Sequence, residues 1–190
     1  VNAMQKLFIK AFLSSEDKNF YAHSGIDIYS LVNASVSNLL NFYNNKRPRG
    51  ASTITQQVAK NFLLTNELSI ERKIKEAILA FRIEKAFSKN RILELYLNEI
   101  YLGMGSYGVA AAALNYFDKS LDELTVPEVA YLAALPKAPN NYHPFRKRGA
   151  AIARRNWVIK QMQKNGFISE RTMTEAQSSD CLLYTSPSPR

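Results

Sequence analysis

The amino-acid sequence predicts an all-α fold. Apolar residues recur at helical spacing through most of the 190 residues, and glycine and proline fall where these periodic segments stop. No two neighbouring segments alternate as paired strands would, and neither an internal repeat nor a heptad series is present. The length is sufficient for one domain, or one domain with a small lobe, that buries a hydrophobic core.

The first expected helix ends at about Glu16. Its apolar positions are Met4, Leu7, Phe8, Ala11 and Phe12. The helix dipole disfavours a carboxylate at this end, and burial would disfavour it further, so both effects raise the pKa of Glu16 toward the range of a general base. The alternative is a solvated Glu16–Asp17 pair that simply closes the helix.

The second expected helix spans residues 28–43 and follows Asp27, a suitable N-cap. Its apolar face is broad and carries few charges, and a basic loop follows at residues 44–49. An apolar helix beside a cationic loop is typical of an interfacial membrane contact. A core helix followed by a flexible loop explains the same pattern, and the sequence leaves both interpretations open.

A polar stretch at residues 49–61 is the most informative part of the chain. Gly50 frees the backbone, and Thr53 with Gln56 fits the capping box that starts a helix. Ile54 and Val58 then give the helix an apolar side. Lys60 is expected one turn after the start of this helix. The helix start is therefore a candidate anion-binding site, because its free N–H groups and the helix dipole favour negative charge. A well-capped surface helix is the alternative.

Further helices are expected from about Ile70, from Lys89 to Leu102, from Ala110, from Thr125 to before Pro136, and lastly from Ala150 to Lys164. Arg72 and Glu76 are four residues apart, which by itself predicts a surface ion pair.

The glycine-rich residues 103–108 follow no strand, so they predict a tight turn with close backbone approach and not a dinucleotide loop. Residues 180–190 match no helical period and are interpreted as a non-native tail.

The composition favours an anionic partner. The net charge is +9 and the pI about 9.6, which suits nucleic acid, an anionic membrane or a phosphorylated substrate. The single cysteine, Cys181, excludes a disulfide framework, and His23 and His143 do not make a zinc cluster. No apolar run has the length of a membrane span, and no signal peptide is visible, so an upstream anchor is expected to be missing from this fragment.

Five segments match, in order, the motifs of one enzyme family. They are Glu16-Asp17-x-x-Phe20-x-x-His23-x-Gly25; Gly50-x-Ser52-Thr53-Ile54-Thr55-Gln56-Gln57 with Lys60-Asn61; Arg72-Lys73-x-x-Glu76; Ile92-Leu93-Glu94-x-Tyr96-Leu97-Asn98 with Tyr101, Gly103 and Gly108; and Arg154-Arg155-x-x-Val158. On these motifs the chain resembles the peptidoglycan glycosyltransferases (glycosyltransferase family 51), specifically the transglycosylase domain of class A penicillin-binding proteins. The resemblance covers about residues 4–175, so the domain is expected to span 1–175.

The resemblance implies a lysozyme-like helical lobe and a small membrane-contacting lobe at about residues 26–50. It also implies polymerisation of lipid II into glycan strands with inversion to a β-1,4 linkage. The acceptor is a sugar hydroxyl that needs a base. The lipid diphosphate leaves as a stable anion, so it needs cations and hydrogen-bond donors and not the second carboxylic acid of a glycosidase pair.

The resemblance assigns roles to particular residues. The catalytic candidates are Glu16, as base, and Glu76; the substrate-binding candidates are Ser52, Thr53, Gln56, Gln57, Lys60, Asn61, Arg72 and Lys73; the supporting candidates are Asp17, Phe20, His23, Gly50, Tyr96, Asn98 and Arg154. No organic cofactor is implied, but a divalent cation, Mg²⁺ or Mn²⁺, assists some members, and Glu76 is its candidate ligand. The implied partners are lipid II, the growing glycan strand and the membrane surface, with cell-wall synthesis proteins as further candidates and without nucleic acid. The implied location is the outer, periplasmic face of a bacterial cytoplasmic membrane.

Two positions depart from the family pattern. Leu68 stands where the family usually has an arginine that contacts the donor diphosphate, and Asp118 stands where a glycine usually follows Tyr-Phe. The change at Leu68 makes an inactive, truncated member of the family one alternative. A lysozyme-like lytic transglycosylase or hydrolase is a second, and a basic nucleic-acid-binding module is a third. The chain stops before any penicillin-binding domain, so transpeptidase activity is not expected.

Overall fold

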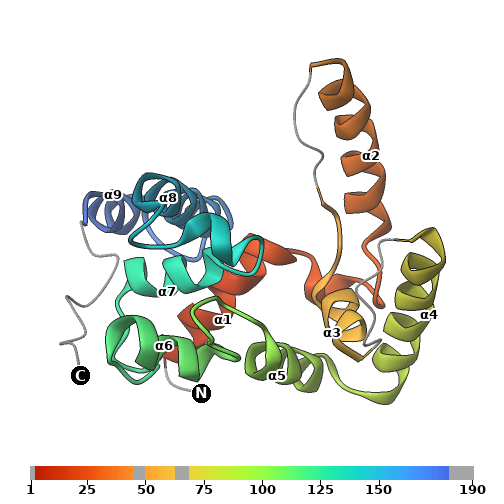
Figure 1. Ribbon diagram of the computed structural model, residues 1–190, viewed down its shortest axis with the longest axis horizontal. Helices are drawn as coiled ribbons and strands as arrows, with labels where there is room; N and C mark the ends of the chain where they lie inside the picture. The colour runs from red at the N-terminus through yellow and green to blue at the C-terminus, as the bar shows by residue number, and fades with distance from the viewer. Residues whose placement is uncertain (1–2, 45–49, 63–68, 180–190) are drawn as a thin grey trace. The chain divides into compact units, whose positions relative to one another are not determined.

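A computed structural model describes residues 3–44, 50–62 and 69–179, and this part of the chain is helical (Figure 1). It contains nine α-helices and two short 3₁₀ helices. The β-type pairing within these residues is one isolated antiparallel bridge between Tyr101 and Tyr107. The predicted all-α class is therefore confirmed, whereas Leu68 and the tail at 180–190 lie outside the described residues.

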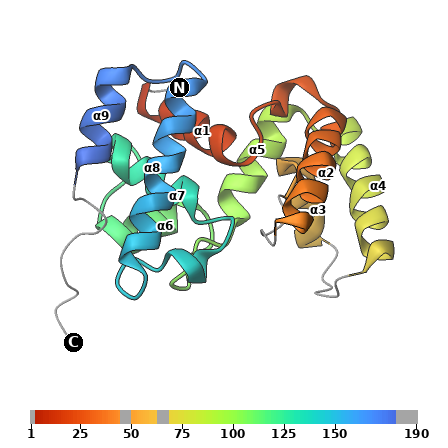
Figure 2. The same cartoon turned by 90° about the horizontal axis from the view of Figure 1, so that it is seen from above.

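Figure 2 shows the helices of the described residues in a second view. They are α1 (Ala3–Glu16), η1 (Phe20–Ala22), α2 (Ile28–Tyr43), α3 (Ile54–Phe62), α4 (Ile70–Ala86), α5 (Lys89–Glu99), α6 (Val109–Phe117), α7 (Val126–Ala134), η2 (Pro139–Tyr142), α8 (Arg148–Lys164) and α9 (Glu170–Ser178).

The predicted elements differ from these bounds at two places. The helix expected to reach Leu102 ends at Glu99, because the chain next turns back to pair Tyr101 with Tyr107. The helix at 148–164 is also not the last one. Ser169 caps α9 by accepting a hydrogen bond from the Thr172 amide at 3.1 Å. The nine residues of this helix include only two apolar side chains, Met173 and Ala176, so the apolar pattern did not reveal it.

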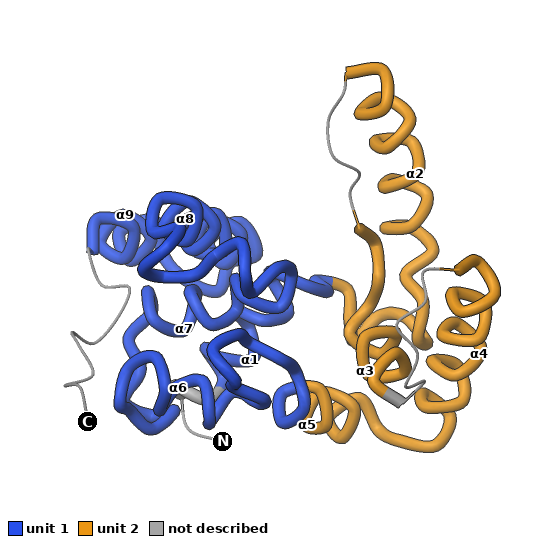
Figure 3. The backbone as a smooth tube through the Cα atoms, in the orientation of Figure 1, with its two compact units in different colours: residues 1–18, 97–190 blue, residues 19–96 orange. Residues whose placement is uncertain are grey.

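The chain divides into two compact units (Figure 3). Unit 1 combines residues 1–18 with 97–190, and unit 2 comprises residues 19–96. The small lobe expected at residues 26–50 lies entirely within unit 2. Its contact with a membrane stays a prediction.

Unit 1 is built around α7. Every residue from Val129 to Leu135 is fully shielded from solvent, and α7 packs against α1 and α8, which in turn carries α9. The predicted capping box at the start of α7 is present, because the Thr125 amide donates to Glu128 Oε2 at 2.7 Å. Lys119 Nζ bonds the other oxygen of this buried carboxylate at 2.7 Å. The start of α7 is thereby tied to the segment after α6.

The connection between α5 and α6 is the tight turn that the glycines predict. Gly108 has a φ of +79°, and a Cβ added there would lie 2.4 Å from the backbone oxygen of Asn98. Gly103 has a φ of +86°, and its added Cβ would lie 2.8 Å from the Tyr116 hydroxyl. Both positions require a residue without a side chain.

We expect Gly108→Ala to lower the free energy of unfolding by about 3 kcal/mol, since it adds both left-handed strain and a clash with backbone. Gly105→Ala is the matched control: Gly105 has a φ of +71°, but nothing lies within 4 Å of an added Cβ. That control carries the strain alone, about 1 kcal/mol. Urea unfolding of both variants measures the difference, and equal losses would contradict the close approach at Gly108.

The departure at Asp118 has a structural explanation. This residue ends α6 with φ +54° and ψ +41°, and its amide donates to the Leu114 carbonyl at 2.9 Å. A helix end in this left-handed conformation is the usual place for glycine, and aspartate is one of the few other residues that tolerate it. Asp118 therefore preserves the helix end that a glycine would make.

In unit 2, α3 packs against α4, and Phe20 is fully buried beneath Lys89, whose Nζ lies 4.4 Å from the ring centroid. The α2 helix is different. It extends away from α3 and α4 (Figure 1), and Ala34 is its buried residue. Its exposed apolar side chains are Ile28, Tyr29, Leu31, Val32, Val36, Leu39, Leu40, Phe42 and Tyr43. The core-helix interpretation of residues 28–43 is therefore wrong, while the cap at Asp27 is confirmed by its bond from the Ser30 amide at 2.9 Å.

No helix among the described residues has the length and hydrophobicity needed to cross a bilayer.

Candidate active site

Glu16 is the last residue of α1, as predicted, and neighbouring helices of unit 1 fix this helix end. Ser15 Oγ donates to the Ala133 carbonyl of α7 at 2.8 Å. Asn165, which follows α8, donates to Ser14 Oγ at 3.1 Å. The Glu16 side chain is half-buried and its Oε1 is shielded from solvent. A carboxylate held in this way is preorganised, which favours a catalytic role.

Arg154 on α8 is electrostatically coupled to Glu16. Burial lowers the pKa of the Arg154 guanidinium, whereas the charge of Glu16 and, less strongly, the phenol of Tyr142 raise it. The guanidinium carbon lies 3.9 Å from the ring centroid of Trp157, which supports the cation through its π face. Arg154 Nε is buried and has no hydrogen-bond partner among the described residues. A carboxylate and an arginine with an unused donor thus interact within unit 1.

Trp157 and Tyr142 were not among the predicted site residues. The three-residue spacing of Arg154 and Trp157 on one helix indicates that they are neighbours, but it does not indicate that Glu16 is near. Tyr142 lies on η2, where no local pattern distinguishes it.

The start of α3 in unit 2 is the predicted capping box. The Thr53 amide donates to Gln56 Oε1 at 3.0 Å, and the Gln56 amide donates to Thr53 Oγ1 at 3.1 Å. Thr53 Oγ1 also donates to the Gly25 carbonyl at 2.6 Å. Both side chains are buried, so the helix is not the surface helix considered as an alternative. These bonds direct Thr53 and Gln56 to protein groups, and their part in binding substrate stays a prediction.

Two details of this stretch are wrong in the prediction. Gly50 has no positive φ and nothing lies within 4 Å of an added Cβ, so the backbone does not require glycine there. Lys60 lies in the last turn of the nine-residue α3, not one turn from its start. A cation at this end is favoured by the helix dipole. Lys60 and Asn61 are exposed, and Gln57 Oε1 accepts a hydrogen bond from the buried Tyr96 hydroxyl at 3.4 Å.

Ser52, Lys73 and Glu76 come together at the first turns of α4. Lys73 Nζ donates to Ser52 Oγ at 2.9 Å and to Glu76 Oε1. Glu76 is only 3% exposed, so the surface ion pair expected between Arg72 and Glu76 is wrong; the buried carboxylate pairs with Lys73. Arg72 is half-buried, and its Nε has no hydrogen-bond partner within the described ranges. One cation, Lys73, therefore joins a hydroxyl to a buried carboxylate, and the preceding residue of α4, Arg72, has an unused buried donor.

The described residues around Glu76 do not by themselves form a complete divalent-cation site, so a cation at Glu76 stays a prediction. Mg²⁺ and Mn²⁺ prefer several oxygen ligands. The Lys73 ammonium already occupies Glu76 Oε1, and residues 3–44, 50–62 and 69–179 hold no group of three histidine, cysteine, aspartate or glutamate residues that could bind a metal.

The supporting candidates have mostly local roles. Asp17 is buried just after α1, and Phe20 is a core residue of unit 2. His23 Nδ1 accepts the Gly25 amide at 3.2 Å and so fixes the turn before α2. Asn98 is exposed on α5, while its backbone lies against Gly108.

Comparisons with known proteins agree with the motifs. A family model described as transglycosylase matches residues 1–163. Penicillin-binding protein 1A of Rickettsia typhi is 52% identical over 183 residues, which cover 96% of this chain and 23% of that protein. Penicillin-binding protein 1A of Escherichia coli K12 is 47% identical, over 88% of this chain and 20% of that protein. The chain thus spans between a fifth and a quarter of the length of these relatives.

Among solved structures, penicillin-binding protein 1A from Haemophilus influenzae is similar, with a TM-score of 0.50 and 34% identity. The match covers 68% of this chain and 16% of that one.

Proposed function

Because the chain belongs to the transglycosylase family, we propose that it is a peptidoglycan glycosyltransferase that polymerises lipid II. The family match does not favour the alternative of a lysozyme-like hydrolase. The observation that carries the proposal is the group formed by Lys73, Glu76 and Ser52, because its fixed cation suits a diphosphate-linked donor, whereas cleavage of a neutral glycan does not call for one.

In the proposed reaction Glu16 acts as the general base. The 4-hydroxyl of the acceptor sugar gives its proton to the Glu16 carboxylate while its oxygen attacks the anomeric carbon of the donor. The new O–C bond forms on the face opposite the leaving group, which accounts for the inversion. Arg154 compensates the charge of Glu16 before the transfer.

The leaving group is the lipid diphosphate, which takes the electron pair of the broken C–O bond. Lys73 and Arg72 supply positive charge for this anion, and Ser52 supplies a hydroxyl. Glu76 orients Lys73 through their hydrogen bond, so we place it as a positioning residue for the donor cations. Gln57, Lys60 and Asn61, which have exposed or half-exposed side chains on α3, are further donor-binding candidates.

The α2 helix supports a membrane location for this reaction. Nine large apolar side chains of α2 are exposed, including Phe42 at 80% and Tyr43 at 79%. Such a surface is stabilised by contact with an apolar phase, at roughly 25 cal/mol for each Å² removed from water. The substrate carries its lipid in the membrane, so we propose that α2 contacts the outer leaflet of the cytoplasmic membrane. A chain that stays in the supernatant when vesicles are sedimented would contradict this contact.

The experiment that tests the proposed function is incubation of the chain with fluorescent lipid II in detergent. We expect a ladder of glycan products that grows with time. Release of small fragments from finished glycan, without polymer from lipid II, would instead identify a hydrolase or lytic enzyme. A folded chain that makes neither product would identify the inactive member of the family.

A further inference from the structure

The connection between α5 and α6 holds two tyrosines in a fixed arrangement. Tyr101 and Tyr107 face each other across the antiparallel bridge, which is closed by the Leu102 amide to the Ser106 carbonyl and the Gly108 amide to the Ile100 carbonyl, both at 2.9 Å. These bonds flank the tyrosine pair, so it is a non-hydrogen-bonded pair, the type whose side chains approach most closely. The ring centroids are 4.9 Å apart.

The base of this loop is rigid and strained. Met104 adopts a φ of +48°, which is uncommon for a residue other than glycine. The Tyr116 hydroxyl donates to the Leu102 carbonyl at 2.8 Å, and Asn115 donates to the hydroxyl of the fully buried Ser106 at 2.9 Å. Strained backbone persists only where surrounding contacts impose it, and it is concentrated at functional sites.

The loop buries Leu102 but exposes three other large side chains. Tyr107 is 66% exposed, Met104 44% and Tyr101 37%. We call these three side chains the aromatic platform. Burial of an aromatic ring in a core stabilises a protein by several kcal/mol. A rigid loop that keeps its aromatic rings in water lacks this stabilisation. Ligand binding accounts for such an arrangement, because a preformed surface loses little entropy on binding.

The aromatic platform adjoins the segment that leads to the Glu16 region of unit 1. An added Cβ on Gly103 would lie 3.1 Å from Pro139 Cβ, so the loop packs against the start of η2. Tyr142, which ends η2, is coupled to Arg154, and Arg154 is coupled to Glu16. The loop that carries the platform therefore lies against the four-residue 3₁₀ helix that ends at Tyr142.

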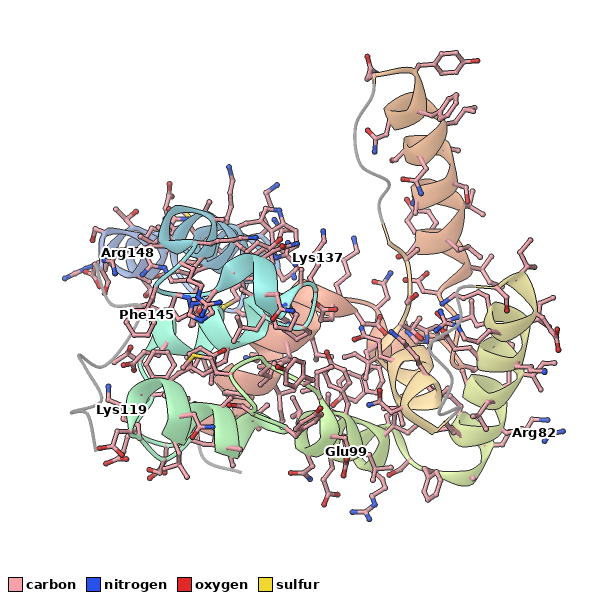
Figure 4. All side chains as sticks on the ribbon, viewed as in Figure 1. Arg82, Glu99, Lys119, Lys137, Phe145 and Arg148 are labelled. Carbon is pink, nitrogen blue, oxygen red and sulfur yellow. The ribbon has the colours of Figure 1, made fainter. Side chains whose placement is uncertain are left out.

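The charges of the loop argue for a neutral ligand. Residues 100–108 contain no charged side chain, and the exposed residue just before them is the acidic Glu99 (Figure 4). An anionic lipid surface would be repelled by this carboxylate and would find no lysine or arginine in the loop. A β-linked pyranose ring fits better, since its axial C–H bonds form an apolar face that packs on an aromatic ring, while its hydroxyls can bond the phenols.

We propose that Tyr101, Met104 and Tyr107 form a binding subsite for a sugar ring of a β-1,4-linked amino-sugar strand. The identity of that strand as the growing peptidoglycan glycan rests on the proposed function. Binding of the sugar itself does not, because the aromatic platform is complete within unit 1 and contains none of the residues assigned to catalysis.

The test is titration of the chain with a β-1,4-linked N-acetylglucosamine tetramer, followed by NMR. We expect Tyr107→Ala to weaken binding about tenfold, as the loss of one stacking contact implies, and Tyr107→Phe to keep it within about threefold. Phe145→Ala is the matched control: Phe145 is another exposed aromatic of unit 1, at 59%, and its loss should leave binding unchanged (Figure 4). Truncation of side chains this exposed should not disturb the fold.

Three outcomes would overturn the proposal: no binding of the tetramer by the unsubstituted chain, equal losses in Tyr107→Ala and Phe145→Ala, or a loss in Tyr107→Ala of binding to phosphatidylcholine vesicles but not to the sugar. A chain that binds the tetramer through Tyr107 but makes no polymer would support the subsite and contradict the proposed function.

Discussion

Glu16→Gln is expected to reduce glycan synthesis from lipid II by at least about 10³-fold, the contribution typical of a positioned general base. Glutamine keeps the size and hydrogen-bonding shape of the side chain but cannot accept the proton of the acceptor hydroxyl. The hydrogen bonds that fix the end of α1 come from Ser15 and Asn165, so they survive the substitution.

Stability should change little in this variant. Removal of a negative charge from a helix C-terminus is mildly favourable, whereas loss of the coupling to Arg154 is mildly unfavourable. We expect the free energy of unfolding to change by less than about 1 kcal/mol. Initial rates of polymer formation and thermal unfolding measure the two effects separately.

The matched control is Glu99→Gln, since Glu99 is also the last residue of an α-helix but is exposed. It should retain activity within about twofold, because no buried group depends on it. Activity of Glu16→Gln within a few-fold of the unsubstituted chain would remove Glu16 from the role of base.

Glu76→Gln is expected to lower kcat/KM for lipid II by at least about 100-fold, equivalent to roughly 2.7 kcal/mol of transition-state stabilisation. The carboxylate of Glu76 is buried and accepts the Lys73 ammonium. A neutral amide would hold that cation less firmly, so Lys73 would lose its fixed position between Ser52 and Glu76. Lys73→Gln should cause a similar loss, and the double variant should be little worse than either, because both residues act as one unit.

The same helix supplies the control for this prediction. Glu71 and Lys75 form an ion pair at 2.6 Å in which the side chains are 77% and 61% exposed. An exposed pair of this kind contributes little, so Glu71→Gln should leave the kinetics unchanged. If Glu71→Gln and Glu76→Gln had equal effects on kcat/KM, the buried pair would have no special role in donor binding.

The sequence by itself determined those features that depend on a few neighbouring residues. Helical periodicity located most of the helices, and the capping residues Asp27, Thr53 and Thr125 marked three helix starts correctly. A cap joins groups within four residues of each other, so its geometry follows once the helix forms. For the same reason the position of Glu16 at the end of α1 could be predicted.

Only the tertiary structure decided burial, pairing and the ends of elements that depend on distant contacts. Spacing allowed Glu76 to pair with Arg72, but packing of α3 on α4 buries the carboxylate and leaves it with Lys73. The apolar face of α2 suited a core equally well until the structure showed it exposed. The early end of α5 and the pairing of Tyr101 with Tyr107 depend on bonds from α6, which a local pattern does not contain. Hydrophobic spacing indicates that one face of a helix is apolar. Which segment covers that face, or whether any does, depends on residues far away in the chain.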